Sequence, residues 1–318
     1  MNQINVYNTY SDHLKTQFGE KVYKLPISLP LTCPNRDGCV GTGGCTFCGE
    51  EGGSFENLSN KLTVKEQISK NMDYIKKRYK ANKFIAYFQS FSNTYLPLEK
   101  FKEYVNEAIQ EDIVGISIST RPDCINDDYL IFLNEIKEQH GLEITIELGL
   151  QTVNYHSLRK INRGHSLAEF IDATLRIKRY GLRICAHLIL NLPWDDMLDV
   201  VENAKVISAL NVDEIKLHSL YIVEGTVLAE EYKNSQITMI SKDEYIERVI
   251  TFLEHLNPEI VIQRVIGRAP EENTLFVNWK ESWWKIRDEI VSQMEEKKTY
   301  QGIKFDYLNG KALKDLNI

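Results

Sequence analysis

Apolar segments that suit buried strands alternate along the chain with amphipathic segments that suit helices. Six apolar segments are rich in Ile, Leu, Val and aromatic residues: 22–29, 84–91, 115–120, 143–150, 183–190 and 214–223. Between them, apolar residues recur every three or four positions, as they do along the buried face of a helix. Strands and helices in this order predict an α/β protein with a parallel sheet.

Three of the expected helices follow a sequence signature for an N-terminal cap. In this signature a Ser or Thr side chain accepts a hydrogen bond from the backbone N–H three residues later. The Glu side chain at that later position accepts a hydrogen bond from the backbone N–H of the Ser or Thr. The signature occurs at Thr63–Glu66, Ser166–Glu169 and Ser241–Glu244. We therefore expect helices to begin at these three places.

Six βα units form either an open sheet or a partial barrel, and in both folds the C-terminal ends of the strands carry the chemistry. After the sixth strand the rhythm changes to a helix over 243–256 and a strand over 259–267. We predict a core domain over residues 1–229 and a C-terminal α+β extension over 230–318 that packs on it. No linker rich in Pro, Gly or Ser separates the two.

The C-terminal segment is rich in aromatic residues. Trp279, Trp283, Trp284 and Ile286 form an apolar stripe along it. We expect this stripe to pack the tail onto the core, because aromatic side chains that stack nucleic-acid bases usually sit in a basic groove.

Composition restricts the location and the partners. The chain has 318 residues, of which 43% are hydrophobic, and this is enough for a sizeable core. It has no signal-peptide-like start and no apolar run long enough to span a membrane, so we expect a cytoplasmic protein with reduced thiols. The net charge of -7 means that any polyanion must bind to a local basic patch. The densest basic run holds Lys76, Lys77, Arg78, Lys80 and Lys83, and such runs are usually the solvated end of a helix.

Four of the six cysteines gather in one loop. Cys33, Cys39, Cys45 and Cys48 lie among Gly, Asn, Asp and Pro residues directly after the first expected strand. A 4Fe–4S cluster held by three thiolates keeps one iron open, whereas a structural zinc ion takes four ligands. The loop lacks the paired Cys-x2-Cys knuckles of many zinc sites, but the ligand types alone leave both metals open.

The residues of this loop resemble a known family. CTFC at 45–48 resembles the Cys-x-aromatic-Cys end of the motif in radical S-adenosylmethionine (radical SAM) enzymes, and CPNRDG with GGCTFC is similar to the YhcC/YtqA-like group. STRPDCI at 119–125, the segment 147–170 and HLILNLPWD at 187–195 resemble segments of the radical SAM subunit of Elongator. The resemblance covers residues 20–268 and implies a partial (β/α)6 barrel of the radical SAM type. Too little chain follows for an acetyltransferase half, so acetyl transfer is not predicted.

The resemblance implies two cofactors. Cys33, Cys45 and Cys48 would hold a 4Fe–4S cluster, which would reduce SAM to a 5′-deoxyadenosyl radical that abstracts hydrogen. The spacing Cys-x11-Cys-x2-Cys is wider than the common Cys-x3-Cys-x2-Cys, so Cys39 is a rival for the first ligand. A reductant such as flavodoxin or ferredoxin is implied as a partner.

Further residues are expected to bind SAM. The resemblance places Phe47 against the adenine, Glu147 and Gln151 at the ribose hydroxyls, and Arg163 at the SAM carboxylate. Glu147 and Gln151 lie at the end of the fourth expected strand. The alternative is an ordinary network of salt bridges around the rim of the barrel.

The end of the second expected strand departs from the family pattern. Most radical SAM enzymes carry Gly-Gly-Glu there for the SAM amino group, but this chain reads YFQSFSNTY. Gln89 or Ser90 must then replace the missing carboxylate.

A substrate pocket is expected at the same strand ends. His187 and His218 lie in strand-like segments and would share one cavity if both point inward, although a lone strand histidine is more often a core residue. Lys216, Arg264 and Arg268 could line that pocket with positive charge. The alternative for them is a solvated edge strand.

Three functions remain open from the sequence. The leading one is a radical SAM enzyme on tRNA, which converts a carboxymethylaminomethyl group at C5 of the wobble uridine to aminomethyl, with Lys76, Lys77 and Arg78 on the phosphates. The second is a radical SAM enzyme on a small molecule or peptide, which the acidic net charge favours. The third is a non-catalytic, zinc-stabilised binding module, which the fourth cysteine favours.

Overall fold

The computed structural model describes residues 5–50, 52, 57–268 and 272–314. A parallel sheet of seven strands organises the molecule, and its neighbours pair in the order β1-β2-β3-β4-β5-β6-β8. The strands are β1 (Val22–Ile27), β2 (Lys83–Phe88), β3 (Ile113–Thr120), β4 (Glu143–Gln151), β5 (Arg183–Ile189), β6 (Glu214–His218) and β8 (Val261–Arg264). The predicted α/β class and the six expected strands are confirmed.

The sheet curls into a half-barrel. Lys24 on the first edge strand donates to the Gln263 side chain on the last edge strand, at 3.0 Å. Helix α1 (Tyr10–Phe18) contacts both edge strands, β1 and β8, beside this bond. The two edges therefore approach each other without pairing, and helix α1 with the residues before it lies across the gap between β1 and β8.

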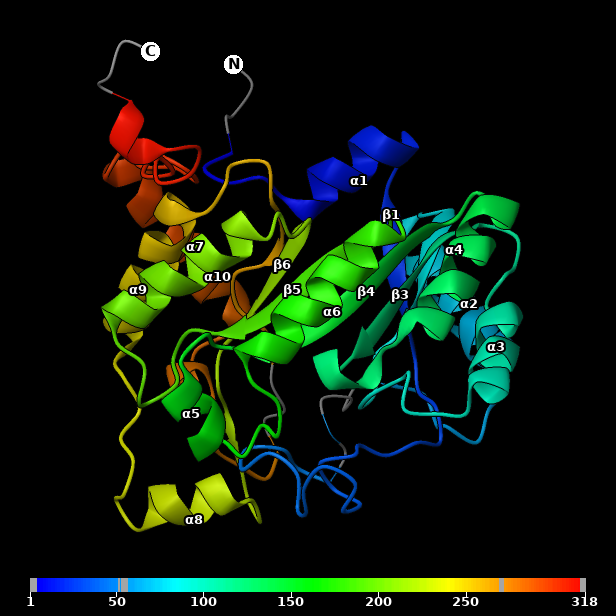
Figure 1. Ribbon diagram of the computed structural model, residues 1–318, viewed down its shortest axis with the longest axis horizontal. Helices are drawn as coiled ribbons and strands as arrows, with labels where there is room; N and C mark the ends of the chain where they lie inside the picture. The colour runs from blue at the N-terminus through cyan, green and yellow to red at the C-terminus, as the bar shows by residue number, and fades with distance from the viewer. Residues whose placement is uncertain (1–4, 51, 53–56, 269–271, 315–318) are drawn as a thin grey trace.

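Most helices cover the outer face of the sheet, whereas α5 and α8 lie at the end of the sheet with the cysteine loop (Figure 1). The helices after α1 are α2 (Val64–Tyr79), α3 (Leu98–Glu107), α4 (Asp127–His140), α5 (Tyr155–Lys160), α6 (Leu167–Arg179), α7 (Met197–Ala209), α8 (Val227–Lys233), α9 (Lys242–His255) and α10 (Trp283–Glu296). Short 3-10 turns lie at Pro122–Cys124, Asn278–Lys280 and Lys311–Leu313, and β7 (Ile222–Val223) pairs antiparallel with β9 (Thr274–Phe276). Among the helices that the structure describes, none is both long and apolar enough to cross a bilayer.

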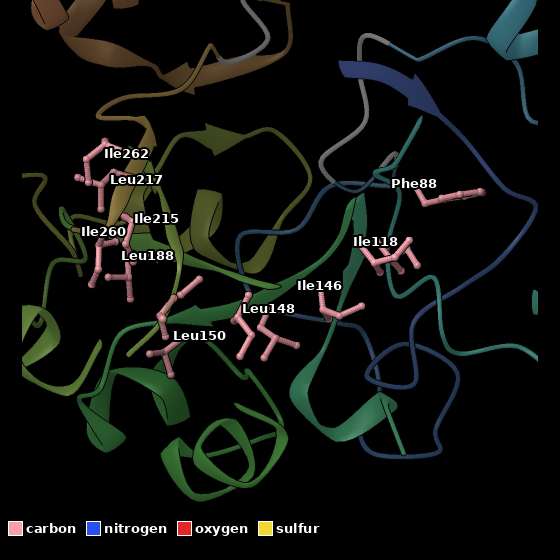
Figure 2. Packing of buried hydrophobic residues seen from close by; sticks show 14 of the residues in the cluster. Phe88, Ile118, Ile146, Leu148, Leu150, Leu188, Ile215, Leu217, Ile260 and Ile262 are labelled. Carbon is pink, nitrogen blue, oxygen red and sulfur yellow. The ribbon is translucent and has the colours of Figure 1, made fainter. Parts of the chain in front are cut away.

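The core lies between the sheet and these helices. On β4 the residues Ile144, Ile146, Leu148 and Leu150 are buried among apolar neighbours from other strands and helices (Figure 2). The alternating residues Thr145 and Glu147 point to the opposite face, because side chains of a strand alternate between its two sides. The helix-facing side of the sheet is therefore apolar, and the inside of the half-barrel carries polar groups.

One strand lies in a different place from the prediction. The strand expected within the C-terminal extension is β8, and it pairs parallel with β6 as the seventh member of the main sheet. Helix α9, which packs on α7, provides the crossover between β6 and β8. The extension thus shares the main sheet, and the domain boundary at residues 229/230 stays a prediction.

The cysteine loop lies at the C-terminal ends of the strands, because it follows β1 directly. In Figure 1 this blue loop is at the bottom of the view, whereas α1 and both chain ends are at the top. The polar inner face of the barrel opens towards the loop.

Candidate active site

Asn35 and Asn162 fix the cysteine loop against the segment that follows α5. The Asn35 amide donates to the carbonyl of Asn162 at 2.6 Å, and the Asn162 amide donates to the carbonyl of Gly44 at 2.8 Å. Asn35 fits because two glycines leave room for it: a Cβ on Gly41 or Gly164 would lie 2.5 or 2.6 Å from its side-chain oxygen. These reciprocal hydrogen bonds hold the glycine-rich loop in one defined conformation.

Hydrogen-bond donors face the sulfurs of this loop. Arg36 lies 3.1 Å from the Cys48 sulfur, Asn35 lies 3.7 Å from the Cys45 sulfur, and the Ser92 hydroxyl lies 3.9 Å from the Cys33 sulfur. Arg163 also points at Cys45, with its Nη1 atom 3.6 Å from the sulfur. Donors in these positions stabilise negative charge on thiolate ligands.

Three of the four thiols form one group. Burial raises the pKa of the Cys48 thiol, the Arg36 guanidinium opposes this, and the neighbouring thiols of Cys45 and Cys33 raise the pKa further. Cys39 is exposed, and it contacts the hydroxyl of Tyr95. The structure therefore brings together the three cysteines of the predicted ligand set and leaves Cys39 at the surface.

The loop does not present a closely spaced set of metal-ligand atoms among the described residues. Among the described residues, the His, Cys, Asp and Glu ligand atoms that gather in threes within 4.8 Å of one another belong to Glu147, Cys185 and His187 and not to the loop. A tetrahedral zinc ion needs its thiolates about 4 Å apart at Zn–S bonds of about 2.3 Å. A 4Fe–4S cluster holds each thiolate on a different iron, and it accepts a wider spacing.

Gln151 and Arg163 meet at the end of β4. A Cβ on Gly149 would lie 2.7 Å from Nη2 of Arg163 and 3.0 Å from Nε2 of Gln151. Both side chains therefore pack directly against this glycine, in space that a side chain would fill. Arg163 donates to the Gly149 carbonyl at 2.9 Å, and Arg121 donates to the Arg163 carbonyl at 2.8 Å. The Oε1 atom of Gln151 and the Nε atom of Arg163 are buried without a hydrogen-bond partner. Unpartnered buried polar atoms are costly, and here they mark a place where a polar ligand fits.

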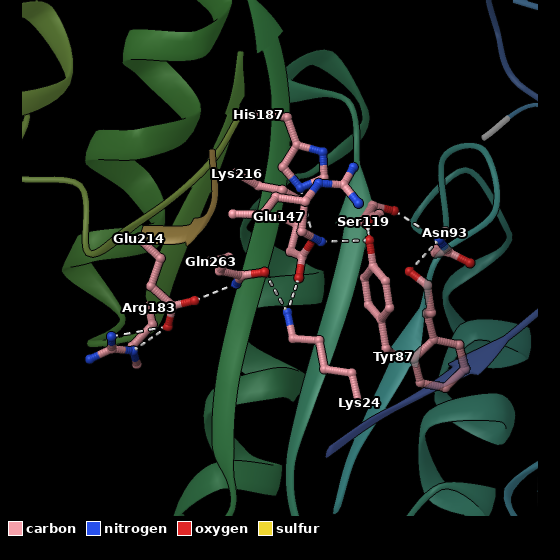
Figure 3. A network of polar contacts seen from close by, with 12 residues as sticks. Lys24, Tyr87, Asn93, Ser119, Glu147, Arg183, His187, Glu214, Lys216 and Gln263 are labelled. Atoms are coloured by element: carbon pink, nitrogen blue, oxygen red, sulfur yellow. Dashed lines mark hydrogen bonds and ion pairs between the residues drawn. The ribbon is translucent and has the colours of Figure 1, made fainter. Parts of the chain in front are cut away.

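Glu147 lies deeper than the sequence suggested. It sits in the middle of β4, 1% exposed, and its carboxylate contacts Lys24, Lys216 at 2.6 Å and His187 at 2.7 Å (Figure 3). Burial opposes ionisation, but Lys216 and Lys24 hold the pKa of Glu147 well below its usual value. Both carboxylate oxygens have partners, so a contact with the SAM ribose stays a prediction, and the geometry gives Glu147 the role of counter-ion for two buried lysines.

Lys216, His218 and Arg264 come together inside the barrel. The rings of His187 and His218 lie 5.1 Å apart, and Nη2 of Arg264 lies 2.6 Å from Nδ1 of His218. Lys216 donates to the Tyr87 hydroxyl at 3.0 Å, and burial lowers its pKa to about 8 despite the Glu147 carboxylate. The two histidine rings therefore lie side by side on the inner face of the sheet, and a shared substrate cavity stays a prediction. Arg268 lies exposed beyond the end of β8.

Other predicted residues have mostly local partners. Ser90 is buried at the end of β2, where its hydroxyl lies 3.0 Å from that of Ser28 and accepts from Asn57. The Gln89 backbone donates to the Ile27 carbonyl. Phe47 is partly buried against the smaller apolar cluster that contains Leu158 and Leu220. Their predicted contacts with SAM stay predictions.

The basic run lies away from the site. Lys76, Lys77 and Arg78 are in the last turn of α2, which returns from the C-terminal end of β1 to the start of β2. Lys76 pairs with Asp112 at 2.7 Å, and Arg78 bonds the Tyr74 hydroxyl. The run is therefore at the opposite end of the sheet from the cysteines.

Sequence reasoning missed several residues that build the site. Asn35, Arg36 and Arg121 lie inside the quoted motifs, but no role was assigned to them. Lys24 and Tyr87 line the inside of the barrel, and Lys24 carried a signal because it interrupts an apolar strand segment. A charged residue within such a segment needs a buried partner.

Comparisons with known proteins agree with this geometry. The family model described as the radical SAM superfamily matches residues 36–206, and the radical SAM C-terminal domain model matches residues 212–296. The uncharacterized protein YtqA of Bacillus subtilis is 36% identical over 305 residues, covering 95% of this chain and 94% of YtqA.

Two more distant matches belong to longer proteins. A tRNA uridine(34) acetyltransferase of Methanocaldococcus jannaschii is 29% identical over 165 residues, which cover 49% of this chain and 28% of that protein. The solved structure of Methanocaldococcus infernus Elp3 with an N-terminal deletion has a TM-score of 0.67 at 19% identity and covers 88% of this chain and 64% of that one. This second match shows a shared fold. The chain therefore belongs to the radical SAM superfamily, whose enzymes use a 4Fe–4S cluster and SAM, and within it to the YhcC/YtqA group related to the radical SAM subunit of Elongator.

Proposed function

We propose that Cys33, Cys45 and Cys48 bind the 4Fe–4S cluster and that Cys39 is not a ligand. Two observations support this assignment. The thiols of Cys45 and Cys33 lie close enough to Cys48 to raise the pKa of its thiol. Arg36, Arg163 and Ser92 each point a hydrogen-bond donor at one of the three sulfurs. Cys39 is exposed and does not share these donors.

When bound, the cluster supplies the electron that cleaves SAM to a 5′-deoxyadenosyl radical, which removes hydrogen from the substrate. The residues of this chain bind and orient. Arg163 offers a guanidinium to the SAM carboxylate, because its Nε atom is buried without a partner beside the ligand Cys45. Gln151 offers its unpartnered side-chain oxygen to a ribose hydroxyl. Arg36 and Asn35 donate towards the thiolates and hold them in place.

The substrate that we propose is tRNA, modified at the C5 substituent of the wobble uridine from carboxymethylaminomethyl to aminomethyl. One observation carries this choice: around His187 and His218 the inside of the barrel holds more cationic than anionic charge, whereas Glu214 at the start of β6 pairs with Arg183. Lys24 and Lys216 share the single carboxylate of Glu147, and among the described residues no carboxylate lies within 4.0 Å of the Arg264 guanidinium. A substituent that ends in a carboxylate complements such a site. The match to a tRNA uridine(34) acetyltransferase supports the same substrate class.

A radical SAM enzyme on a small molecule or peptide is the second candidate. The net charge of -7 favours it, because a protein that is acidic overall repels a polyanion unless a local patch receives it.

The proposal is tested by mass spectrometry of the nucleosides of tRNA from a strain that lacks the gene. We expect the carboxymethylaminomethyl uridine to accumulate and the aminomethyl form to disappear. Wild-type protein should restore the aminomethyl form, and Cys45→Ala should not. Identical wobble nucleosides in both strains would exclude tRNA and leave the second candidate.

A further inference from the structure

A groove runs beside β8, on the side of the half-barrel that helix α1 covers. A cavity of about 740 Å³ lies between the segment 5–12, strand β8 and helix α10. Its walls carry three arginines and three large aromatic side chains. They are Arg264, Arg268, Arg287, Tyr7, Tyr10 and Trp283.

Cations and rings alternate within this groove. The Arg287 guanidinium lies over the ring of Trp283, 5.5 Å from its centroid, and Tyr7 lies close enough to Arg287 for the guanidinium to affect its pKa. Trp283 is 37% exposed, so part of the indole is accessible to a ligand. Sites that bind single-stranded nucleic acid combine basic side chains for the phosphates with aromatic rings on which bases stack.

Acidic groups offset only part of this charge. Asp288 pairs with Arg287 at 2.6 Å, and Asp12 accepts from the Thr9 hydroxyl, at the α1 end of the groove. Arg264 has no carboxylate within 4.0 Å among the described residues. The charge of Arg264 therefore adds to the positive charge of the groove.

The groove is connected with the inside of the barrel. Arg264 lines it and also contacts His218, which stacks near His187. Gln263 lines it and also bonds Lys24 inside the barrel. Arg264 and Gln263 thus link the groove to the polar groups inside the barrel.

The three C-terminal tryptophans do not all behave as expected. Trp279 packs the tail onto the core, because its indole N–H donates to the Ile240 carbonyl and its ring lies 5.0 Å from that of Tyr245. Trp283 instead sits in a groove with basic walls, which is the setting that a base-stacking residue requires. Trp284 is 47% exposed, lies under Lys285 at 5.7 Å, and does not line the groove.

We propose that this groove receives an unpaired nucleotide of the RNA substrate, with the base on Trp283 and the phosphate on Arg287 and Arg268. The proposal rests on the proposed function, and it names the face by which the RNA docks. It moves docking away from Lys76, Lys77 and Arg78, which lie at the end of α2.

The test compares two neighbouring cation–aromatic pairs on α10. A labelled anticodon stem-loop RNA is titrated with cluster-loaded protein at several salt concentrations, for Trp283→Ala, Trp284→Ala, Arg287→Ala and Lys285→Ala. We expect Trp283→Ala to weaken binding on the order of tenfold or more and Trp284→Ala to leave it unchanged, because base stacking acts only in the groove. Arg287→Ala should reduce the salt slope by about 1, and Lys285→Ala should not. Cluster absorbance and the unfolding midpoint establish that each variant is folded.

The outcomes separate the two proposals. Tight RNA binding by the wild type and by all four variants would overturn the groove and leave the tRNA function standing. Equal losses at both pairs would also overturn it, because they would show attraction to a general surface. Absence of RNA binding by the wild type, together with unchanged wobble nucleosides in the deletion strain, would overturn both.

Discussion

At the scale of single residues, the site depends on side chains that fit because a neighbour is small or oppositely charged. Gly149 has no side chain, so Arg163 and Gln151 can pack against the end of β4. The Glu147 carboxylate provides the negative charge that allows two lysines to lie inside the barrel. Burying an ion costs several kcal/mol unless partners surround it, so each of these charges depends on the others.

Gly149→Ala should weaken SAM binding while the cluster stays intact. The added Cβ would lie 2.7 Å from the Arg163 guanidinium, which must move away from the SAM carboxylate. Gly49→Ala is the control, because its Cβ would make an ordinary 3.5 Å contact with Val223. Equilibrium dialysis with SAM measures the effect, and the cluster absorbance reports the ligands. Equal SAM affinity in the two variants would place the carboxylate site elsewhere.

His187 should make the protein sensitive to acid. Burial and the nearby Lys216 lower its pKa from 6.5 to about 4, although the hydrogen bond to Glu147 acts in the other direction. Between these two values the unfolded chain binds a proton that the folded protein does not, so stability falls as the pH falls.

Urea unfolding between pH 6.5 and 4 measures this effect. The wild type should lose more stability over the interval than His187→Gln, by up to about 3 kcal/mol. His140→Gln, at the exposed end of α4, should follow the wild type. Parallel curves for the wild type and His187→Gln would show that His187 titrates normally.

At the scale of elements, the sequence predicted the features that neighbouring residues determine, which are the helix caps and the positions of the strands. Thr63 and Ser166 form both bonds of the capping box, whereas Ser241 forms one, because Glu244 pairs with Arg248 instead. The six strands were visible because their apolar residues cluster. The parallel pairing of β8 with β6 joins segments more than forty residues apart, and no local pattern encodes it. For the same reason, the polar partners that different strands supply inside the barrel were not predictable.

Thr63→Ala should destabilise the protein by about 1 kcal/mol, because the first turn of α2 loses the hydroxyl that accepts from Glu66. Thr63→Ser keeps the hydroxyl and should behave like the wild type. Urea midpoints measure the difference. SAM cleavage should persist in both, since α2 lies outside the barrel. A midpoint for Thr63→Ala equal to that of Thr63→Ser would show that the cap contributes nothing.

At the scale of the whole molecule, the distribution of charge matters more than its sum. The net charge is -7, yet Lys216 and Arg264 lie inside the barrel and three arginines line the groove beside β8. The cysteine loop lies at the C-terminal end of this barrel, and helix α1 lies across the gap between β1 and β8. The densest basic run of the sequence is at the other end of the sheet, where it cannot serve the site directly.

The central claim is that three of the four loop cysteines hold a cluster that cleaves SAM. The most direct measurement is the iron and sulfide content, with the yield of 5′-deoxyadenosine, of anaerobically prepared wild type and of the four single Cys→Ala variants. We expect Cys33→Ala, Cys45→Ala and Cys48→Ala to lose most of the iron and all SAM cleavage, and Cys39→Ala to keep both. Loss of the cluster in Cys39→Ala but not in Cys33→Ala, or colourless wild-type protein that contains zinc, would contradict the account.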